Sequence, residues 1–168
     1  GVHFDKREAK NDVWSSADGI SWTQEQTPPF APRYDHALEV FGGKMWLTGG
    51  VALGGRGFAD EWVSEDGRNW SLVNAEASFG PRHGHAMISH QNLLWIIGGW
   101  DTVLDRGSSE AWYSGDGVLW QKTEQDGPWT GREDHAVAEY KNRLWLTGGM
   151  SGTAEAVRWT NDIWVSGF

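Results

Sequence analysis

Three copies of one segment, spaced about fifty residues apart, constrain this chain more than any other feature. The copies read APRYDHALEVFGGKMWLTGGVA from Ala31, PRHGHAMISHQNLLWIIGGWD from Pro81 and TGREDHAVAEYKNRLWLTGGMS from Thr130. Each contains an Arg, a His-Ala pair, an apolar stretch, a polar turn, a Trp and a Gly-Gly pair. A fixed period of this length indicates an array of structural repeats that bury their faces against their neighbours.

A second block recurs between these copies. It reads NDVWSSADGISW from Asn11, DEWVSEDGRNW from Asp60 and EAWYSGDGVLW from Glu110, and a fourth copy begins at Asn161 as NDIWVSGF. The Asp-Gly pair supplies the positive φ angles of a tight hairpin, and the preceding Ser can hydrogen-bond the turn backbone. Each block therefore predicts two short strands joined by a turn.

The two blocks together predict four short strands per repeat and no helix. In the middle repeat the first pair covers 86–89 and 93–97, with His90-Gln91-Asn92 at the turn. In the first hairpin the strands cover 13–16 and 21–24. Gly1 precedes Trp14 by the interval at which Gly99 precedes Trp112, so Gly1 takes the place of the second glycine in Gly-Gly. The fold class is all-β.

Composition limits the partners of the chain. A net charge of -9 argues against nucleic acid and against anionic membrane surfaces, because both require clustered Lys and Arg. No run is long and apolar enough to span a bilayer. The absence of cysteine excludes a disulfide framework and a thiolate metal site, and we expect no cofactor. The start at Gly1, without a Met or a signal-like segment, favours a processed or excised product.

Gly-Gly after an apolar strand, a Trp about 13 residues later and the period near fifty resemble the kelch repeat of β-propellers. The wording NDVW, SxDGxxW and PRxxHA is most similar to bacterial kelch-like and galactose-oxidase-type propellers. The resemblance covers 11–168 and implies about three and a quarter four-stranded blades. It divides the chain into an outer strand pair (1–27), two blades (28–75 and 76–125) and three strands of a last blade (126–168). It also favours a secreted or periplasmic location.

Propellers close a ring of four to eight blades, so the resemblance implies a second copy or a remaining segment that closes this one. Two copies would bring one surplus strand each, because 11–16 and 161–166 are the same strand of the repeat. This conflict favours a fragment or subunit of a longer propeller over a homodimer.

Residues that recur in every repeat are predicted to be scaffold. Ten of the 13 Trp fall at three repeated positions and should pack one blade against the next. The repeated Arg could mimic a sialidase cluster, but one per blade at a scaffold position favours structural pairing. The repeated His are interpreted as hydrogen-bonded structural groups. An oxidase-type copper site would need a Cys, which is absent, and converging Tyr ligands, whereas the three Tyr fall at different repeat positions.

Positions that vary within the repeat are the candidate ligand contacts. In kelch proteins the residues after the Arg and the loops after Gly-Gly line the face where ligands bind. The matching positions here are Tyr34, Asp35, His83, Trp100, Asp101, Glu133, Asp134 and Met150. Trp100 has no repeat counterpart and is expected to stand at an open loop. His83 and His85 could be metal ligands, but no acid or third His is near in sequence, so no metal site is predicted.

The absence of a nucleophile, metal or phosphate motif predicts a non-catalytic kelch-type binding scaffold. Acidic and aromatic residues at one rim suit a protein or basic peptide, or a glycan. The alternative is a carbohydrate-active propeller enzyme, sialidase-, epimerase- or oxidase-like, whose site is completed by a missing segment or a second chain. We predict no catalytic residue.

Overall fold

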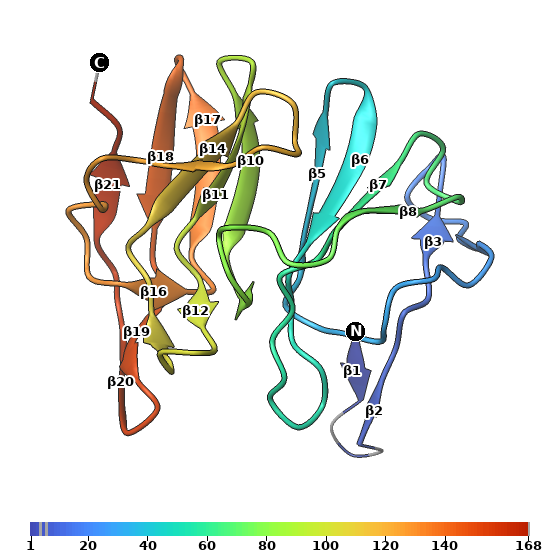
Figure 1. The fold of residues 1–168 in the computed structure, drawn as a ribbon, viewed down its shortest axis with the longest axis horizontal. Coiled ribbons are helices and arrows are strands. Elements are labelled where there is room, and N and C mark those ends of the chain that lie inside the picture. Colours follow the sequence, from blue (N-terminus) through green and yellow to red (C-terminus); the bar gives the residue numbers. More distant parts are fainter. Residues whose placement is uncertain (4, 6, 168) are drawn as a thin grey trace.

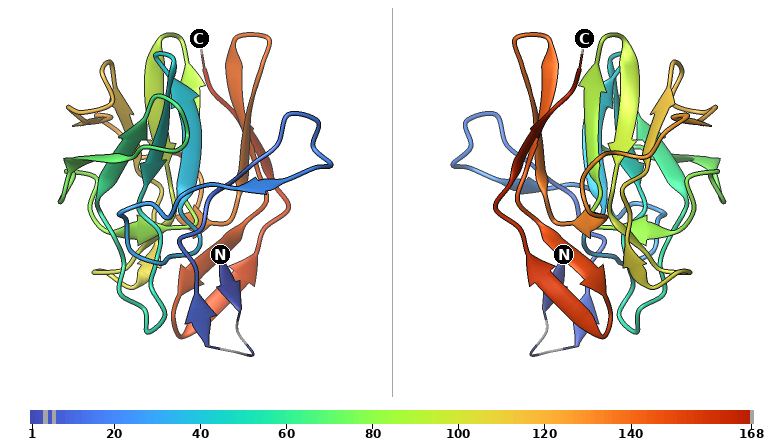
Figure 2. Two further views of the ribbon diagram at one scale, coloured as in Figure 1. Left: turned by 90° about the vertical axis from the view of Figure 1, so that its right-hand side faces the viewer. Right: turned by 90° about the vertical axis from the view of Figure 1, so that its left-hand side faces the viewer.

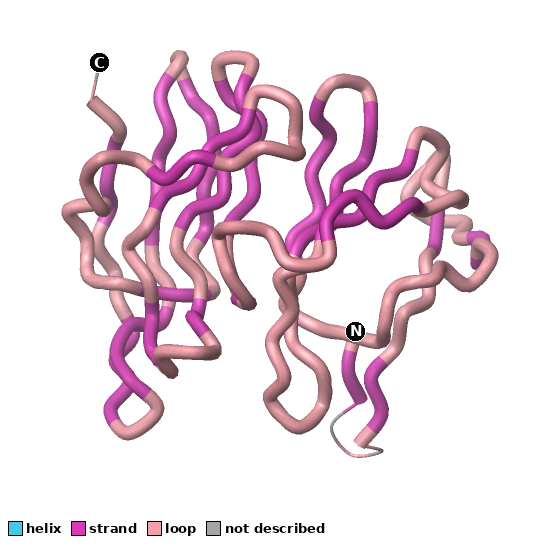
Figure 3. The backbone as a smooth tube through the Cα atoms, viewed as in Figure 1, coloured by secondary structure: helices cyan, strands magenta, loops and turns pink. Residues whose placement is uncertain are grey.

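The computed structural model describes residues 1–3, 5 and 7–167, and all regular structure among them is β-strand (Figure 1). Figure 3 shows the strands along the backbone, joined by loops and turns. No described segment forms a helix long and apolar enough to cross a membrane. The predicted all-β class is confirmed, and the strands form several antiparallel sheets.

Two four-stranded antiparallel sheets form the middle of the molecule. The first sheet has the order β5 (Ala37–Phe41), β6 (Lys44–Thr48), β7 (Glu61–Ser64) and β8 (Ser71–Asn74). The second has the order β10 (Ala86–His90), β11 (Leu93–Ile97), β14 (Ala111–Ser114) and β15 (Gln121–Lys122). Each order follows the chain, as a repeat of two hairpins requires.

Shorter sheets flank this pair. The hairpin of β3 (Trp14–Ser15) and β4 (Thr23–Gln24) comes first, and the sheet of β17 (Ala136–Tyr140), β18 (Arg143–Thr147) and β21 (Ile163–Val165) comes last. The predicted pattern of two, four, four and three strands is therefore present. The division of the chain into propeller blades stays a prediction.

Further short strands, which were not predicted, lie at the start of the chain, at Arg82 and Arg132, and after the last two Gly-Gly pairs, whereas only isolated bridges follow Gly49-Gly50. The strands β1 (Val2–His3) and β2 (Glu8–Ala9) pair with each other. A six-stranded sheet contains β16 (Arg132–Glu133), β19 (Met150–Thr153), β13 (Arg106–Gly107), β12 (Trp100–Asp101) and β9 (Arg82–His83), with β20 (Ala156–Trp159) beside β19. In Figure 1 the strands of this sheet lie below the second and last sheets, and the pairing of β13 with β19 connects the second and third repeats.

The same backbone hydrogen bond joins each repeat to the next. The Gly50 amide donates to the Arg82 carbonyl at 2.9 Å, and the Gly99 amide donates to the Arg132 carbonyl at 2.8 Å. The amino group of Gly1 donates to the Arg33 carbonyl at 3.1 Å. Gly1 thus makes the contact of a second glycine, which confirms the place predicted for it.

The repeated Arg are structural, as predicted. These residues are 1% exposed, and each guanidinium donates at 2.8 Å to the first carbonyl of the following Gly-Gly pair. Each also pairs with an acid, which accepts the indole N–H of the Trp two residues later; the acids are Asp60, Glu110 and Asp162. Because each buried guanidinium binds all these partners, it fixes the segment that contains the Arg, the Gly-Gly pair and the next hairpin relative to one another.

The Asp-Gly turns have the predicted chemistry. Ser64 Oγ accepts the Gly67 amide at 2.8 Å, and Asp66 Oδ1 accepts the amides of Arg68 and Asn69. The same bonds recur in the turns at Asp18 and Asp116. Because these contacts are local, each turn can form without help from neighbouring sheets.

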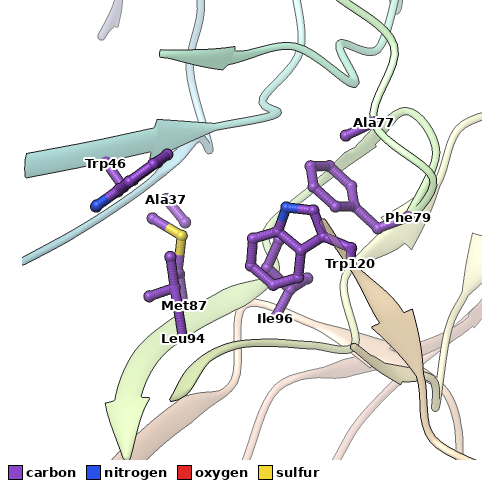
Figure 4. Close-up of a cluster of buried hydrophobic side chains, with 8 residues drawn as sticks. All are labelled: Ala37, Trp46, Ala77, Phe79, Met87, Leu94, Ile96 and Trp120. Carbon is purple, nitrogen blue, oxygen red and sulfur yellow. The ribbon is translucent and has the colours of Figure 1, made fainter. Parts of the chain in front are cut away.

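The largest core cluster lies between the two four-stranded sheets (Figure 4). Leu94 and Ile96 from β11 are fully buried there, and Trp46 from β6 is 5% exposed. Trp120 follows the Asp-Gly turn of the second sheet, and its ring meets Phe79 edge-on with centroids 5.4 Å apart. Smaller clusters fill the spaces before the first sheet and after the second. The core is thus divided into layers between successive sheets.

Candidate functional site

The residues that follow the repeated Arg meet at Gly84. The Gly84 amide donates to the Asp35 carbonyl at 2.9 Å, and the Asp134 amide donates to the Gly84 carbonyl at 2.8 Å. Asp35, Gly84 and Asp134 have φ angles of 53°, 59° and 54°, so all three adopt the left-handed conformation. Asp tolerates this region better than most residues. Three repeats therefore contribute equivalent residues to one place.

Four side chains gather there, and we call them the Gly84 cluster: Asp35, His83, Glu133 and Asp134. His83 Nδ1 lies 2.9 Å from Glu133 Oε2 but lacks the alignment of a hydrogen bond, so this buried nitrogen has no hydrogen-bond partner. A Cβ on Gly84 would lie 2.8 Å from Asp134 Oδ1 and 2.9 Å from Glu133 Cβ. Glycine at this position leaves the room that the two acids occupy.

The cluster concentrates negative charge. Glu133 is 4% exposed, whereas Asp35 and Asp134 reach the solvent. Burial raises the pKa of Asp35, and the Glu133 charge adds to that rise while His83 opposes it. Burial also raises the pKa of Asp134, with further contributions from the charges of Glu133 and Asp35. Carboxylates that repel one another in this way favour a cation between them.

Tyr34 and Met150 flank the cluster. Tyr34 is half-buried and exchanges two backbone hydrogen bonds with Val51, at 3.0 and 2.9 Å. Met150 is half-buried and lies opposite Glu133 in the β16–β19 ladder. Both predicted residues thus lie next to the acids in sequence or in the sheet.

Trp100 was expected to stand at an open loop, and this expectation is wrong. It lies opposite His83 in the β9–β12 ladder, but its side chain is 7% exposed and its indole N–H donates to Asp105 Oδ1 at 3.1 Å. Asp105 has a φ of 52°, which turns the segment back toward the indole. Asp101 accepts the amides of Val103 and Leu104 in the same turn. A ligand contact by Trp100 or Asp101 stays a prediction.

No acid lies near His83 along the sequence, but two acids lie near it in space. Glu133 comes from the next repeat and Asp35 from the preceding one. The signal that could have found them is the period itself, because positions 35, 84 and 134 are equivalent and begin adjacent inner strands.

The chemistry open to the cluster is ionic and acid–base. Among the described residues no group of three or more His, Asp or Glu has the arrangement of a metal site.

Comparison with known proteins finds no matching family model and no similar curated protein.

Proposed function

We propose that the chain is part of a kelch-type β-propeller and serves as a binding scaffold for a basic peptide. Support for the architecture comes from the two four-stranded sheets of identical order and from the strand pairs before and after them. The repeated Gly-to-Arg backbone bonds and the packing of each sheet on the next are the relations expected of neighbouring blades.

The observation that carries the proposed ligand is the Gly84 cluster. Three carboxylates from two repeats surround one imidazole, and among the described residues no Lys or Arg forms an ion pair with them. A Lys or Arg side chain would supply charge-assisted hydrogen bonds to these oxygens. A sugar is a poorer fit, because Trp100 is buried and presents no open ring beside the acids.

The loops at the same edge of the sheets favour a peptide. The loops and the strand β20 carry exposed apolar side chains there, at Leu53, Val103, Leu104, Val157 and Trp159. Figure 1 places the loops that follow each Gly-Gly at one edge of the molecule. The acids of the Gly84 cluster and the apolar side chains at the same edge together suit a basic segment that also carries apolar residues.

Calorimetric titration with a tetralysine peptide tests this function, with tetra-alanine as the uncharged reference. Asp35→Asn and Asp134→Asn should each weaken tetralysine binding by about fivefold, or ~1 kcal/mol, because each removes one partly exposed charge. The matched control is Glu76→Gln, an exposed acid outside the cluster, which should leave binding unchanged. Equal affinities for all three variants would contradict the proposal.

A second candidate is a carbohydrate-active enzyme, favoured by one observation. Asp35 and Asp134 have raised pKa values beside the buried Glu133, and carboxyls in unequal environments can divide the roles of acid and base. A panel of chromogenic glycosides separates the two functions. Turnover that Asp35→Asn or Glu133→Gln abolishes would replace the scaffold function with catalysis.

A further inference from the structure

Two buried histidines adjoin the Gly84 cluster in the chain. His85 follows Gly84 directly and His135 follows Asp134 directly. The two histidines are 6% and 7% exposed. A displacement of either ring therefore moves the backbone that brings the acids of the cluster together.

Each imidazole packs on a glycine of the preceding repeat, and we call these two contacts the His–Gly joints. His85 Cε1 lies 2.7 Å from the position that a Cβ on Gly49 would take, and His135 Cε1 lies 2.8 Å from that of a Cβ on Gly98. Only glycine leaves room for the ring at these places. In Figure 2 the turns of the hairpins β10–β11 and β17–β18 stand at the top of the molecule, so the joints lie at the other ends of these hairpins.

Neither joint provides a counterion for a proton. Among the described residues no carboxylate forms an ion pair with His85 or His135. His85 Nε2 lies 2.9 Å from Thr48 Oγ1, but its Nδ1 has no hydrogen-bond partner. The residue equivalent to Thr48 in the next repeat is Ile97, which carries no hydroxyl, and neither ring nitrogen of His135 has a hydrogen-bond partner. An imidazolium at either joint would thus be a buried, unpaired charge.

The charges around His85 add to this penalty. Its ring faces the guanidinium of Arg82 and the imidazoles of three other histidines, namely His36, His83 and His135. Burial lowers the pKa of His85 well below its ordinary value of 6.5, and each of these cationic groups lowers it further. The ring is therefore neutral in the folded chain at neutral pH.

His135 has fewer charged neighbours and the same preference. Burial lowers its pKa to about 4, the Arg132 charge adds to the fall, and the backbone of Ile97 opposes it. Below the ordinary pKa of 6.5 the unfolded state therefore binds a proton that the folded state does not bind. Stability is complete above that pKa and is lost as the pH falls from about 6.5 toward about 4.

We propose that the two His–Gly joints form an acid-sensitive switch, in which neutral imidazoles hold the repeats together at the Gly84 cluster and protonated imidazoles separate them there. The hydrogen bonds donated by the Gly84 and Asp134 amides connect the repeats in this cluster, so they break when the joints open. Any ligand that requires the assembled cluster is then released in acid. The proposal does not depend on which ligand the cluster binds.

Hydrogen exchange measured by two-dimensional NMR tests the switch on the unmodified chain. Dividing each rate by that of an unstructured peptide at the same pH gives a protection factor free of the intrinsic pH dependence. Protection of the Gly84 and Asp134 amides should fall by about 20-fold or more from about pH 7 to about pH 5, because each opened imidazole takes up a proton. The reference is the Thr123 amide, which donates to the Ala111 carbonyl at 3.0 Å within one repeat and should lose less protection.

A variant assigns the effect to the imidazole. His135→Gln keeps a polar side chain but removes the titrating group, so the loss of protection at Asp134 between the two pH values should be about 20-fold smaller than in wild type. The matched control is His90→Gln. His90 is also 7% exposed, but it lies 3.1 Å from Glu139 Oε2, a carboxylate that can pair with a protonated ring. This control should keep the wild-type pH dependence. All other titrating groups are common to the variants, so their contributions cancel.

Three outcomes overturn the proposal. The first is equal protection of the Gly84 and Asp134 amides at both pH values in wild type, a result that needs no variant to fold. The second is a loss at Thr123 as large as that at Gly84 and Asp134, which would mean unfolding of the whole chain. The third is a loss of protection in His135→Gln that equals the loss in wild type.

Discussion

The layer between the two four-stranded sheets and the layer before the last sheet are built from equivalent residues, yet they differ in how completely they are covered. In the middle layer Trp46 is 5% exposed and Trp120 is 8% exposed. In the last layer Trp95 is half-buried, and the place of Trp120 is an open groove. In the middle layer the hairpin that carries Trp120 covers this place.

The energetic role of a repeated residue therefore depends on its neighbour more than on its identity. Trp46 and Trp145 occupy the same position in the repeat, but Trp145 is 38% exposed because no described sheet packs against its face. Free energy from apolar burial scales with the area removed from water, so equal side chains contribute unequally. The stability of a repeat array is therefore a sum that includes a contribution from each interface between neighbouring repeats.

The largest expected effect contrasts two tryptophans of the same motif. Trp120→Ala should lower the free energy of unfolding by about 3–5 kcal/mol, because it empties the middle layer. Trp22→Ala should change it by less than about 0.5 kcal/mol in dilute solution, since Trp22 is mostly exposed. Urea denaturation at one low concentration measures both. Similar losses would mean that the hairpins do not differ in burial in solution.

A smaller effect is expected from the hydroxyl that joins the first sheet to the second. Thr48 Oγ1 lies 2.9 Å from His85 Nε2, and both groups are buried. Thr48→Val keeps the shape but removes the partner of the imidazole, which should cost about 1–3 kcal/mol.

The control for this change is Thr147→Val, at the same repeat position on the uncovered face. Thr147 is exposed, so its replacement should cost less than about 0.5 kcal/mol. Urea denaturation of the two variants compares the covered and uncovered faces. If Thr147→Val is as costly as Thr48→Val, the contact with His85 is not the reason for the loss.

Local chemistry explains why much of the fold could be predicted. The Asp-Gly turns and the apolar stretches predicted strands within one or two residues of those observed, as for β10, which extends to His90. The six-stranded sheet was missed, because pairs such as Arg106 with Thr153 join different repeats and have no local signal. Long-range pairing of short strands is a property of the assembled fold.

The candidate site was predicted as separate residues and not as a cluster. Variable positions identified Asp35, His83, Glu133 and Asp134, but their convergence depends on how closely the repeats approach at Gly84. Trp100 shows the opposite failure. Its lack of a repeat counterpart suggested an open loop, whereas a nearby acid, Asp105, holds the indole in a buried position.

The last prediction concerns the pH dependence of stability that arises from the acid buried in the middle layer. Glu61 is fully buried and accepts the Trp120 indole N–H, whereas the equivalent positions in the other repeats hold Val13, Ala111 and Ile163. Burial raises the pKa of Glu61 to about 8, the Trp120 hydrogen bond opposes that rise, and the Asp116 and Asp60 charges add to it. Glu61 is therefore protonated in the folded chain at neutral pH.

The sign of the pH dependence follows from this raised pKa. Below the unfolded pKa of 4.5 both states are protonated, and Glu61 carries no ionisation penalty. As the pH rises from there to about 8, the unfolded state loses its proton first, so folding becomes less favourable by up to ~1.4 kcal/mol per pH unit. Glu61→Gln keeps an acceptor for Trp120 and removes this dependence. In urea denaturation, the free energy of unfolding of the variant should therefore rise relative to that of wild type between about pH 6 and about pH 7. A difference that stays constant over that interval would show that Glu61 is already ionised in the folded layer.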